Sequence, residues 1–182
     1  MDKSARFEHG VMPHLGAAYN LARWLTRDDH DAEDVVQEAC LRALTFFDGF
    51  RGGDPRSWLL AIVRNTCFTW LQHNRPSELV DADVYDWNEA TPRAAVCGDS
   101  ENDPEILALR KADARDIDAA LLGLSAVFRE VVILRDIEGL SYKEIAKVVD
   151  APVGTVMSRL SRARSELRRA LAASRNAGGR KE

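Results

Sequence analysis

Residues 140–164 read LSYKEIAKVVDAPVGTVMSRLSRAR, and this stretch decides the fold of the C-terminal part of the chain. Ser141 and Glu144 have the spacing of a capping box, in which each side chain accepts a hydrogen bond from a backbone N–H at the start of a helix. Asp150-Ala-Pro152 predicts a turn, because Asp tolerates a left-handed backbone and Pro favours the first position of a helix. The small Ala146 lets two helices approach at a steep angle. The stretch therefore predicts a helix-turn-helix.

The second helix of this motif has two different faces. Apolar residues recur at spacings of three and four, and we expect them to point inward: Val153, Val156, Leu160, Ala163 and Leu167. The free face carries short hydroxyls, one methionine and two arginines: Thr155, Met157, Ser158, Arg159, Ser161 and Arg162. Hydroxyl and guanidinium groups reach phosphates and base edges when a helix lies in the major groove. We interpret this face as a reader of duplex DNA; the alternative is a solvated basic helix in a plain bundle.

The charge of the chain is unevenly distributed. The formal net charge of −4 over 182 residues is unusual for a protein that binds DNA. However, residues 76–106 contain nine acidic residues and one basic residue, whereas residues 151–181 contain eight basic residues and one acidic residue. Three prolines interrupt the acidic segment. We interpret this segment as a flexible linker between two helical blocks.

The N-terminal block, residues 11–74, also has helical periodicity. Asp31-Ala-Glu-Asp34 predicts a capped helix start, followed by an apolar stripe of Ala32, Val35, Val36, Ala39, Cys40, Ala43, Leu44 and Phe47. Residues 49–54 predict a turn, and Asp54-Pro55 predicts the next helix start. That helix is expected to bury Trp58, Leu59, Ile62, Val63 and Trp70. Because no stretch alternates as a strand would, the predicted fold class is all-α.

Several classes of function are disfavoured by composition. Cys40, Cys67 and Cys97 are far apart and the four histidines are scattered, so we expect no disulfide framework, metal or cofactor. The chain shows no nucleophile–base pair and no Gly-rich phosphate loop, so we do not expect an enzyme. No apolar run approaches the ~20 residues that span a bilayer. The first residues are polar where a signal peptide needs an apolar core, which predicts a cytoplasmic location.

Three motifs occur in series along the chain. They are DAEDVVQE at residues 31–38, PRSWLLAIVRN at residues 55–65, and the helix-turn-helix. Together they resemble the extracytoplasmic-function subfamily of bacterial RNA polymerase sigma factors, over nearly the whole chain and in the family's order. The resemblance implies two small helical domains joined by a flexible acidic linker. The expected boundaries are a sigma region-two domain at 1–75, the linker at 76–110, a region-four helix-turn-helix domain at 111–175, and a disordered tail at 176–182.

The resemblance also implies roles for particular residues. The helix from Asp31 would dock on core RNA polymerase through Asp31, Asp34, Gln37, Glu38 and Arg42. The melted minus-ten promoter element would meet Phe50, Arg51, Arg56, Arg64, Asn65 and Phe68, which are suitable types for base stacking and for backbone charge. We assign Trp58 to the core rather than to a base. The face from Thr155 to Arg162 would read the minus-thirty-five element.

The function implied is a sigma factor that binds core RNA polymerase and directs promoter-specific transcription initiation, in a stress or envelope response, held inactive by an anti-sigma factor. Two positions depart from the family pattern: Asp150 stands where Gly is usual, and Met157 stands where a basic residue is common. The base preference cannot therefore be copied from relatives. One alternative is a sigma-like decoy that sequesters an anti-sigma factor, which would lose Arg159 and Arg162. Another is a free-standing helix-turn-helix regulator, which would leave the first two motifs unexplained.

Overall fold

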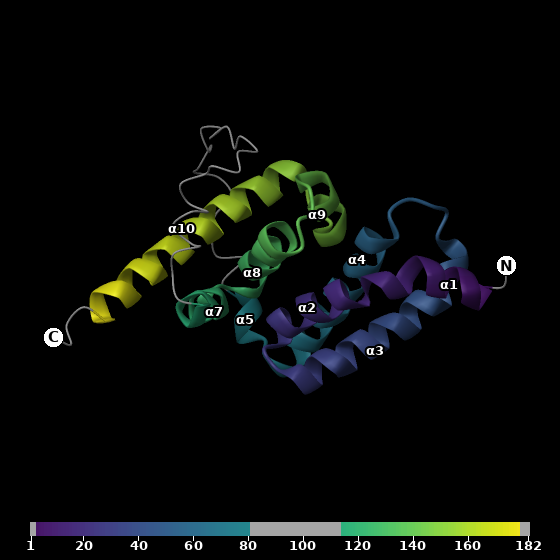
Figure 1. The fold of residues 1–182 in the computed structure, drawn as a ribbon, viewed down its shortest axis with the longest axis horizontal. Helices are drawn as coiled ribbons and strands as arrows, with labels where there is room; N and C mark the ends of the chain where they lie inside the picture. Colours follow the sequence, from purple (N-terminus) through teal and green to yellow (C-terminus); the bar gives the residue numbers. More distant parts are fainter. Residues whose placement is uncertain (1–2, 81–113, 179–182) are drawn as a thin grey trace.

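The structure, a computed structural model, describes residues 3–80 and 114–178 of the chain. Every regular element in these ranges is helical, which confirms the all-α prediction (Figure 1). The N-terminal unit consists of α1 Lys3–Val11, η1 Met12–His14, α2 Leu15–Thr26, α3 Asp29–Phe46, η2 Phe47–Gly49, α4 Pro55–Asn74 and α5 Ser77–Val80. The C-terminal unit consists of α7 Ala114–Gly123, α8 Ala126–Val132, η3 Ile133–Ile137, α9 Tyr142–Val149 and α10 Val153–Gly178.

The core of the N-terminal unit lies between α2, α3 and α4, which contact one another. Each helix buries one apolar stripe, including Leu21 and Leu25 of α2, Val35 of α3, and Leu59 and Val63 of α4. Most of the stripe predicted for α3 is buried, but Leu44 is exposed. Three side chains that were expected to be buried in α4 are only half-buried: Trp58, Ile62 and Trp70.

Two Asp side chains cap the long helices of this unit. Asp54 accepts hydrogen bonds from the backbone N–H groups of Arg56 and Ser57 at 3.1 and 2.9 Å, which confirms the predicted start of α4. The predicted cap at Asp31 is wrong, because α3 begins earlier. Asp28 has an extended backbone and accepts from the N–H groups of His30 and Asp31 at 2.9 and 3.1 Å. These bonds, that of Asp31 first, lower the pKa of the Asp28 carboxyl.

The C-terminal unit packs α7, α8 and α9 against the long helix α10. Residues 126–137 divide into α8 and the π-helical turn η3. Gly139 follows this segment with a φ of 71°, a conformation that favours glycine.

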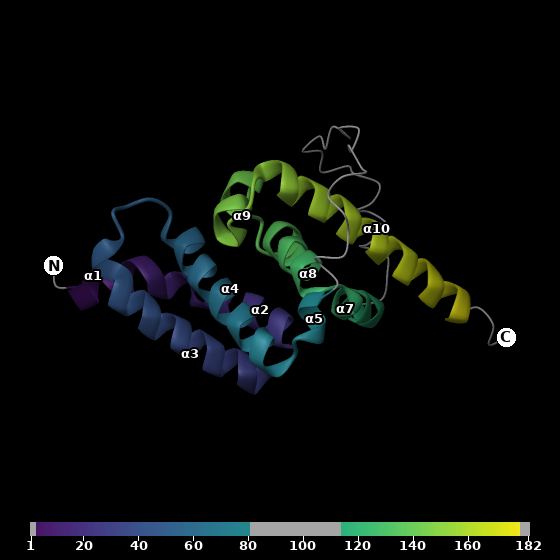
Figure 2. The same ribbon diagram turned by 180° about the vertical axis from the view of Figure 1, so that it is seen from behind.

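The two units lie against each other, with α4 on α9 and α2 on α8 (Figures 1 and 2). Helix α5 occupies residues that were assigned to the linker, and α10 continues past residue 176, where the tail was expected to begin. Residues 81–110 of the predicted linker, Cys97 among them, lie outside the described ranges, and the domain boundaries remain predictions. Within residues 3–80 and 114–178, no helix is both long and apolar enough to cross a membrane.

Candidate nucleic-acid interface

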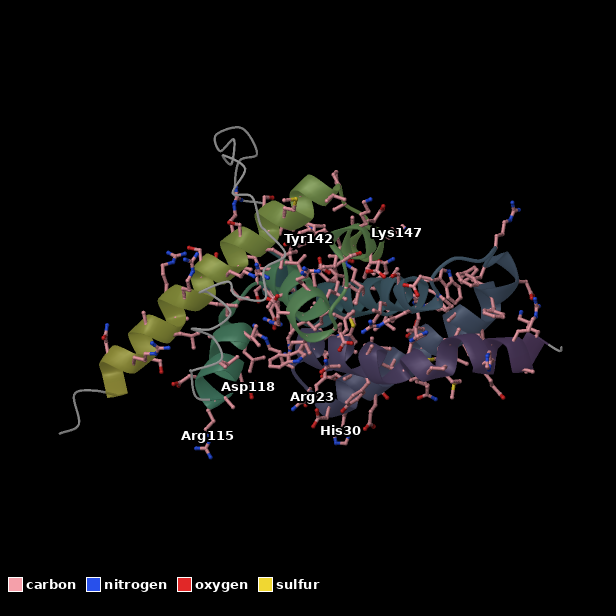
Figure 3. The ribbon with its side chains drawn as sticks, turned by 45° about the horizontal axis from the view of Figure 1, so that its top comes forward. Arg23, His30, Arg115, Asp118, Tyr142 and Lys147 are labelled. Atoms are coloured by element: carbon pink, nitrogen blue, oxygen red, sulfur yellow. The ribbon has the colours of Figure 1, made fainter. Side chains whose placement is uncertain are left out.

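The predicted helix-turn-helix is present in α9 and α10. Glu144 N donates to Ser141 Oγ at 3.3 Å, and Ser141 N donates to Glu144 Oε2 at 2.7 Å, which completes the capping box. Hydrogen bonding by Ser141 lowers the pKa of the Glu144 carboxyl. Asp150 adopts the left-handed conformation, with φ 52° and ψ 55°. Figure 3 shows Tyr142 and Lys147 on α9, beside the first turns of α10.

Helix α10 presents the expected inward face, with one exception. Val156, Leu160, Ala163 and Leu167 are buried, as predicted. Val153 is 37% exposed, so the prediction that it points inward is wrong. It is the first residue of α10, where the helix has just emerged from the turn.

The side chains predicted to read duplex DNA all lie in the first three turns of α10. Ser161 and Arg162 are exposed, and Thr155, Met157, Ser158 and Arg159 are half-buried. The Ser158 hydroxyl donates to the Thr155 carbonyl at 3.0 Å, within the helix. Farther along, Arg164 pairs with Asp136 of η3 at 2.7 Å, which ties the helix to its own unit. This face therefore offers hydroxyl, thioether and guanidinium groups on a rigid helix.

The residues predicted for the minus-ten element lie around the turn before α4 and along that helix. Gly52 and Gly53 have φ values of 93° and 115°, which L side chains rarely adopt. Phe50 stands at the edge of an aromatic cluster, with its ring centroid 4.9 Å from that of Trp58 and 6.1 Å from that of Phe47. Trp58 thus packs against the core while remaining half-buried. Arg51 and Asn65 are exposed.

Two of these predicted minus-ten residues contact the C-terminal unit instead of solvent. Arg56 Nη2 donates to both the backbone carbonyl and Oε2 of Glu138, each at 2.8 Å. Arg64 makes a two-pronged contact with Glu130, Nε to Oε2 at 2.7 Å and Nη2 to Oε1 at 3.2 Å. The Arg64 guanidinium also lies 3.8 Å from the centroid of the Phe68 ring. Sequence analysis predicted the residue types but not these partners.

Glu130 is a completely buried carboxylate at the junction of the two units. Its side chain is 0% exposed, and burial raises its pKa while the Arg64 hydrogen bonds oppose that shift. Arg159 of α10 also approaches the carboxylate, with Nη1 3.9 Å from Oε1. One carboxylate thus stands between a predicted minus-ten residue and a predicted minus-thirty-five residue.

The residues predicted to bind polymerase lie along α3. Asp34, Gln37, Glu38 and Arg42 are exposed, and Asp31 is half-buried beside the cap of the helix. Arg42 pairs with Glu38 one turn away. Shallow hollows on this face are also lined by two apolar side chains that sequence analysis did not single out, Leu41 and Phe46, which are 61% and 65% exposed. The sequence pattern that could have identified them is an apolar residue on an otherwise polar helix face.

A buried arginine that sequence analysis also missed joins the ends of several helices. Arg129 is 0% exposed and donates to the carbonyls of Leu121, Leu122 and Leu124 at 3.1, 3.3 and 2.6 Å. Its Nη1 reaches across to the Trp24 carbonyl of α2 at 3.0 Å. Burial lowers its pKa to about 10, and the neighbouring Arg27 acts in the same direction, so the group stays cationic near neutral pH. In the sequence Arg129 stands within an apolar run, and nothing in that local pattern indicates this role.

The two cysteines within the described ranges, Cys40 and Cys67, are shielded from solvent to different degrees. Cys67 is buried in α4, and burial raises its pKa to about 12. Cys40 is half-buried in α3, and burial raises its pKa as well. In residues 3–80 and 114–178, no three His, Cys, Asp or Glu side chains gather as a metal site requires.

Two family models match the chain, one over each helical unit. Residues 11–76 match the description "Sigma-70 region 2", and residues 114–167 match "Sigma-70, region 4". The ECF RNA polymerase sigma-E factor of Escherichia coli K12 is 36% identical over 144 residues, which cover 75% of this chain and 72% of that protein. The chain belongs to the ECF sigma factors. The predicted polymerase and minus-ten residues fall within the region 2 match, and the predicted minus-thirty-five residues fall within the region 4 match.

Two further comparisons bear on this sigma factor. The ECF sigma factor SigE of Mycolicibacterium smegmatis is 35% identical over 162 residues, which cover 89% of this chain but only 60% of that protein. The sigma factor RpoE of Bartonella quintana, solved in complex with the anti-sigma factor NepR, superposes with a TM-score of 0.66 and 30% identity. That match covers 92% of this chain and 97% of the solved chain. The likeness extends over both helical units.

Proposed function

We propose that this sigma factor binds core RNA polymerase and directs promoter-specific transcription initiation, with no enzymatic activity of its own. The proposal rests on one observation: the same chain matches the sigma region 2 model and, after it, the region 4 model. The recognition helix of region 4 also carries arginines. A free-standing regulator would need only the second match. A decoy for an anti-sigma factor would not need the basic face of Arg159 and Arg162.

The C-terminal unit reads the duplex minus-thirty-five element through the first turns of α10. The proposed contacts are Thr155, Met157, Ser158, Arg159, Ser161 and Arg162. Hydroxyl and guanidinium groups at such positions bind phosphates and base edges. Because Met157 supplies no charge, we expect the phosphate contacts to come mainly from the arginines and from backbone N–H groups at the start of α10.

The N-terminal unit receives the melted minus-ten element. The proposed contacts are Phe50, Arg51, Arg56, Arg64, Asn65 and Phe68. The proximity of aromatic rings to guanidinium groups supports this role, because unpaired bases stack on rings while cations neutralise the backbone. The turn with Gly52 and Gly53 directly follows Phe50, which stands at the edge of the aromatic cluster.

The face of α3 docks on core polymerase. Asp31, Asp34, Gln37, Glu38 and Arg42 would supply its polar contacts, and the exposed Leu41 and Phe46 would supply an apolar anchor. The solved RpoE relative is bound to an anti-sigma factor, which supports a similar inhibitory partner for this chain. We place the protein in the cytoplasm, where polymerase acts, and in a stress or envelope response.

The proposal is tested by adding the purified protein to core polymerase and sequencing the transcripts made from a genomic DNA library. We expect a stable complex and transcripts that start at a common promoter sequence. Leu41→Glu should lose both, whereas Met12→Glu should keep both, since Met12 is an exposed apolar residue outside α3. The absence of a complex and of specific transcripts for the unaltered protein would overturn the proposal.

A further inference from the structure

The proposed DNA-facing surface of α10 has a basic side and an uncharged side. Residues three or four apart are neighbours on a helix surface, so Thr155, Arg159 and Arg162 share one side. By the same spacing, the other side consists of Val153, Gly154, Met157 and Ser161. Both sides belong to the first three turns of the helix, where duplex DNA is proposed to bind.

The uncharged side is accessible from outside the protein. Val153 is 37% exposed and Met157 is half-buried, so each keeps part of its apolar surface outside the core. Gly154 lies beside them without a side chain. A Cβ at Gly154 would meet no atom within 4 Å beyond its chain neighbours and the backbone of its own helix. The floor of a DNA groove can therefore approach the first turn of α10 next to Met157.

Charge separates the two sides in their choice of DNA contacts. The next charged residue on the uncharged side is Arg164, seven residues after Met157, and its Nη2 lies 2.7 Å from Asp136 Oδ1 of η3. Its side chain is only 11% exposed. DNA phosphates bind where cations are presented to them, so they favour the basic side with its exposed Arg162. The uncharged side is therefore suited to base edges rather than to the phosphate backbone.

An apolar side chain finds one kind of apolar partner in the major groove. The base pairs present hydrogen-bond donors and acceptors there, and thymine alone adds a methyl group, at its C5 atom. A donor or acceptor that is covered by a thioether loses its water and gains no partner, which is unfavourable. Methionine is flexible and polarisable, so it adapts its shape to a methyl group. The chemistry of this side therefore favours thymine.

We propose that Met157, with Val153 beside it, contacts the C5 methyl group of a thymine in the minus-thirty-five element and thereby selects a T·A pair at the position that it faces. This inference rests on the proposed function of α10 as the reader of duplex DNA. Selection has two sources, the attraction of the methyl group and the unpaired polar edge that another base pair would leave against the thioether.

The contact is tested by removing thymine methyl groups one at a time. The holoenzyme is assembled from core polymerase and the unaltered protein, and its promoter is identified from the transcripts that it makes. Each thymine of the minus-thirty-five element, on either strand, is then replaced by uracil, which pairs with adenine but lacks the methyl group. Burial of one methyl-sized group favours binding by a factor of about four. At one position, uracil should therefore weaken holoenzyme binding about fourfold.

Two variants connect this effect to the Met157 side chain. Met157→Ala should bind the thymine promoter more weakly and should no longer distinguish thymine from uracil at that position, and this double comparison isolates the contact. Met157→Leu keeps an apolar side chain of similar size and should retain most of the discrimination. Met12→Ala is the matched control, because Met12 is an exposed methionine of the N-terminal unit, and it should discriminate as the unaltered protein does. A merely structural role of Met157 would weaken binding to thymine and uracil promoters equally.

Three results would overturn the thymine contact. The first is an unchanged affinity of the unaltered holoenzyme at every thymine, or a minus-thirty-five element that contains no T·A pair. The second is an equal loss on uracil DNA for the unaltered protein and Met157→Ala. The third is weaker binding of Met157→Ala to core polymerase with discrimination intact, which would assign the uncharged side to a protein partner. Failure of the proposed function would look different, because the unaltered protein would then make no specific transcripts.

Discussion

Replacing Arg129 by Met tests whether one buried guanidinium holds the C-terminal unit together. The three carbonyls that it binds, those of Leu121, Leu122 and Leu124, lie at the end of α7 and just beyond it, where helix carbonyls lack partners within the helix. Methionine matches the length and flexibility of the arginine stem but donates no hydrogen bond. The variant therefore removes one donor from each of these carbonyls, although that of Leu121 also accepts from the Leu124 N–H at 3.2 Å and that of Leu122 also accepts from Arg27 Nη2.

The size of the effect follows from these contacts. A hydrogen bond from a charged donor contributes about 1.5–3 kcal/mol to stability, and Arg129 makes three of them within its own unit. Burial of the methionine side chain stabilises the folded state by about 1.5–3 kcal/mol, which offsets part of this loss. We therefore expect Arg129→Met to lower the free energy of unfolding by ~3–5 kcal/mol, the range found when a buried charged contact loses one partner.

Urea unfolding followed by far-ultraviolet circular dichroism measures the loss. Arg115→Met is the matched control, since Arg115 also belongs to the C-terminal unit but points into solvent from α7 (Figure 3). Its effect should lie within about 0.5 kcal/mol of zero. A loss below about 1 kcal/mol for Arg129→Met would refute the reasoning, because the guanidinium hydrogen bonds would then contribute little to the stability of the unit.

Three further predictions concern single residues. Arg162→Ala should weaken binding of the holoenzyme to the minus-thirty-five element by ~1–3 kcal/mol, and unchanged affinity and preference would remove Arg162 from the interface. Ser141→Ala should lower the free energy of unfolding by ~1 kcal/mol. Because the pKa of Glu144 is lowered in the fold, its part of the capping contribution is complete above its unfolded-state pKa and is lost as the pH falls through its folded value, while the bond from the Glu144 N–H to the Ser141 hydroxyl remains. The loss in Ser141→Ala should therefore shrink but not vanish in acid, and an equal loss at all pH values would contradict this. Cys67, with its pKa raised to about 12, should resist alkylation in the folded protein and react once the protein unfolds. Mass spectrometry of the peptide that contains Cys67 measures the reaction. Alkylation of the folded protein would contradict the burial of this thiol.

The features that sequence analysis predicted correctly depend on residues close together in the chain. The capping box joins residues three apart, and the Asp54 side chain accepts from Arg56 and Ser57, two and three residues farther on. Such signals are readable because every partner lies within one helical turn. The start of α3 was misplaced for a related reason. The segment has several aspartates in a row, and each can cap a helix, so the choice of Asp28 depends on how the chain leaves α2.

The partners of the candidate site were not predictable in the same way. Arg56 and Arg64 were selected for their residue type and their place in a family motif. Their contacts with Glu138 and Glu130 join residues 82 and 66 positions apart, across two units whose relative placement no local pattern encodes. The exposed Leu41 and Phe46 were readable in principle, but the size of an apolar surface depends on which neighbours cover each side chain.

The sequence by itself determined that the chain is helical, where most helices begin and end, and the order of motifs that marks the family. Only the tertiary structure determines whether the charged side chains in Val127-Phe-Arg-Glu-Val-Val132 are buried or exposed. Both Arg129 and Glu130 are buried within that run. An ionised side chain leaves water only where opposite charges and hydrogen-bonding groups surround it. For these two residues those groups come from α2, α4, α5, α7 and α10, and only folding brings these helices together.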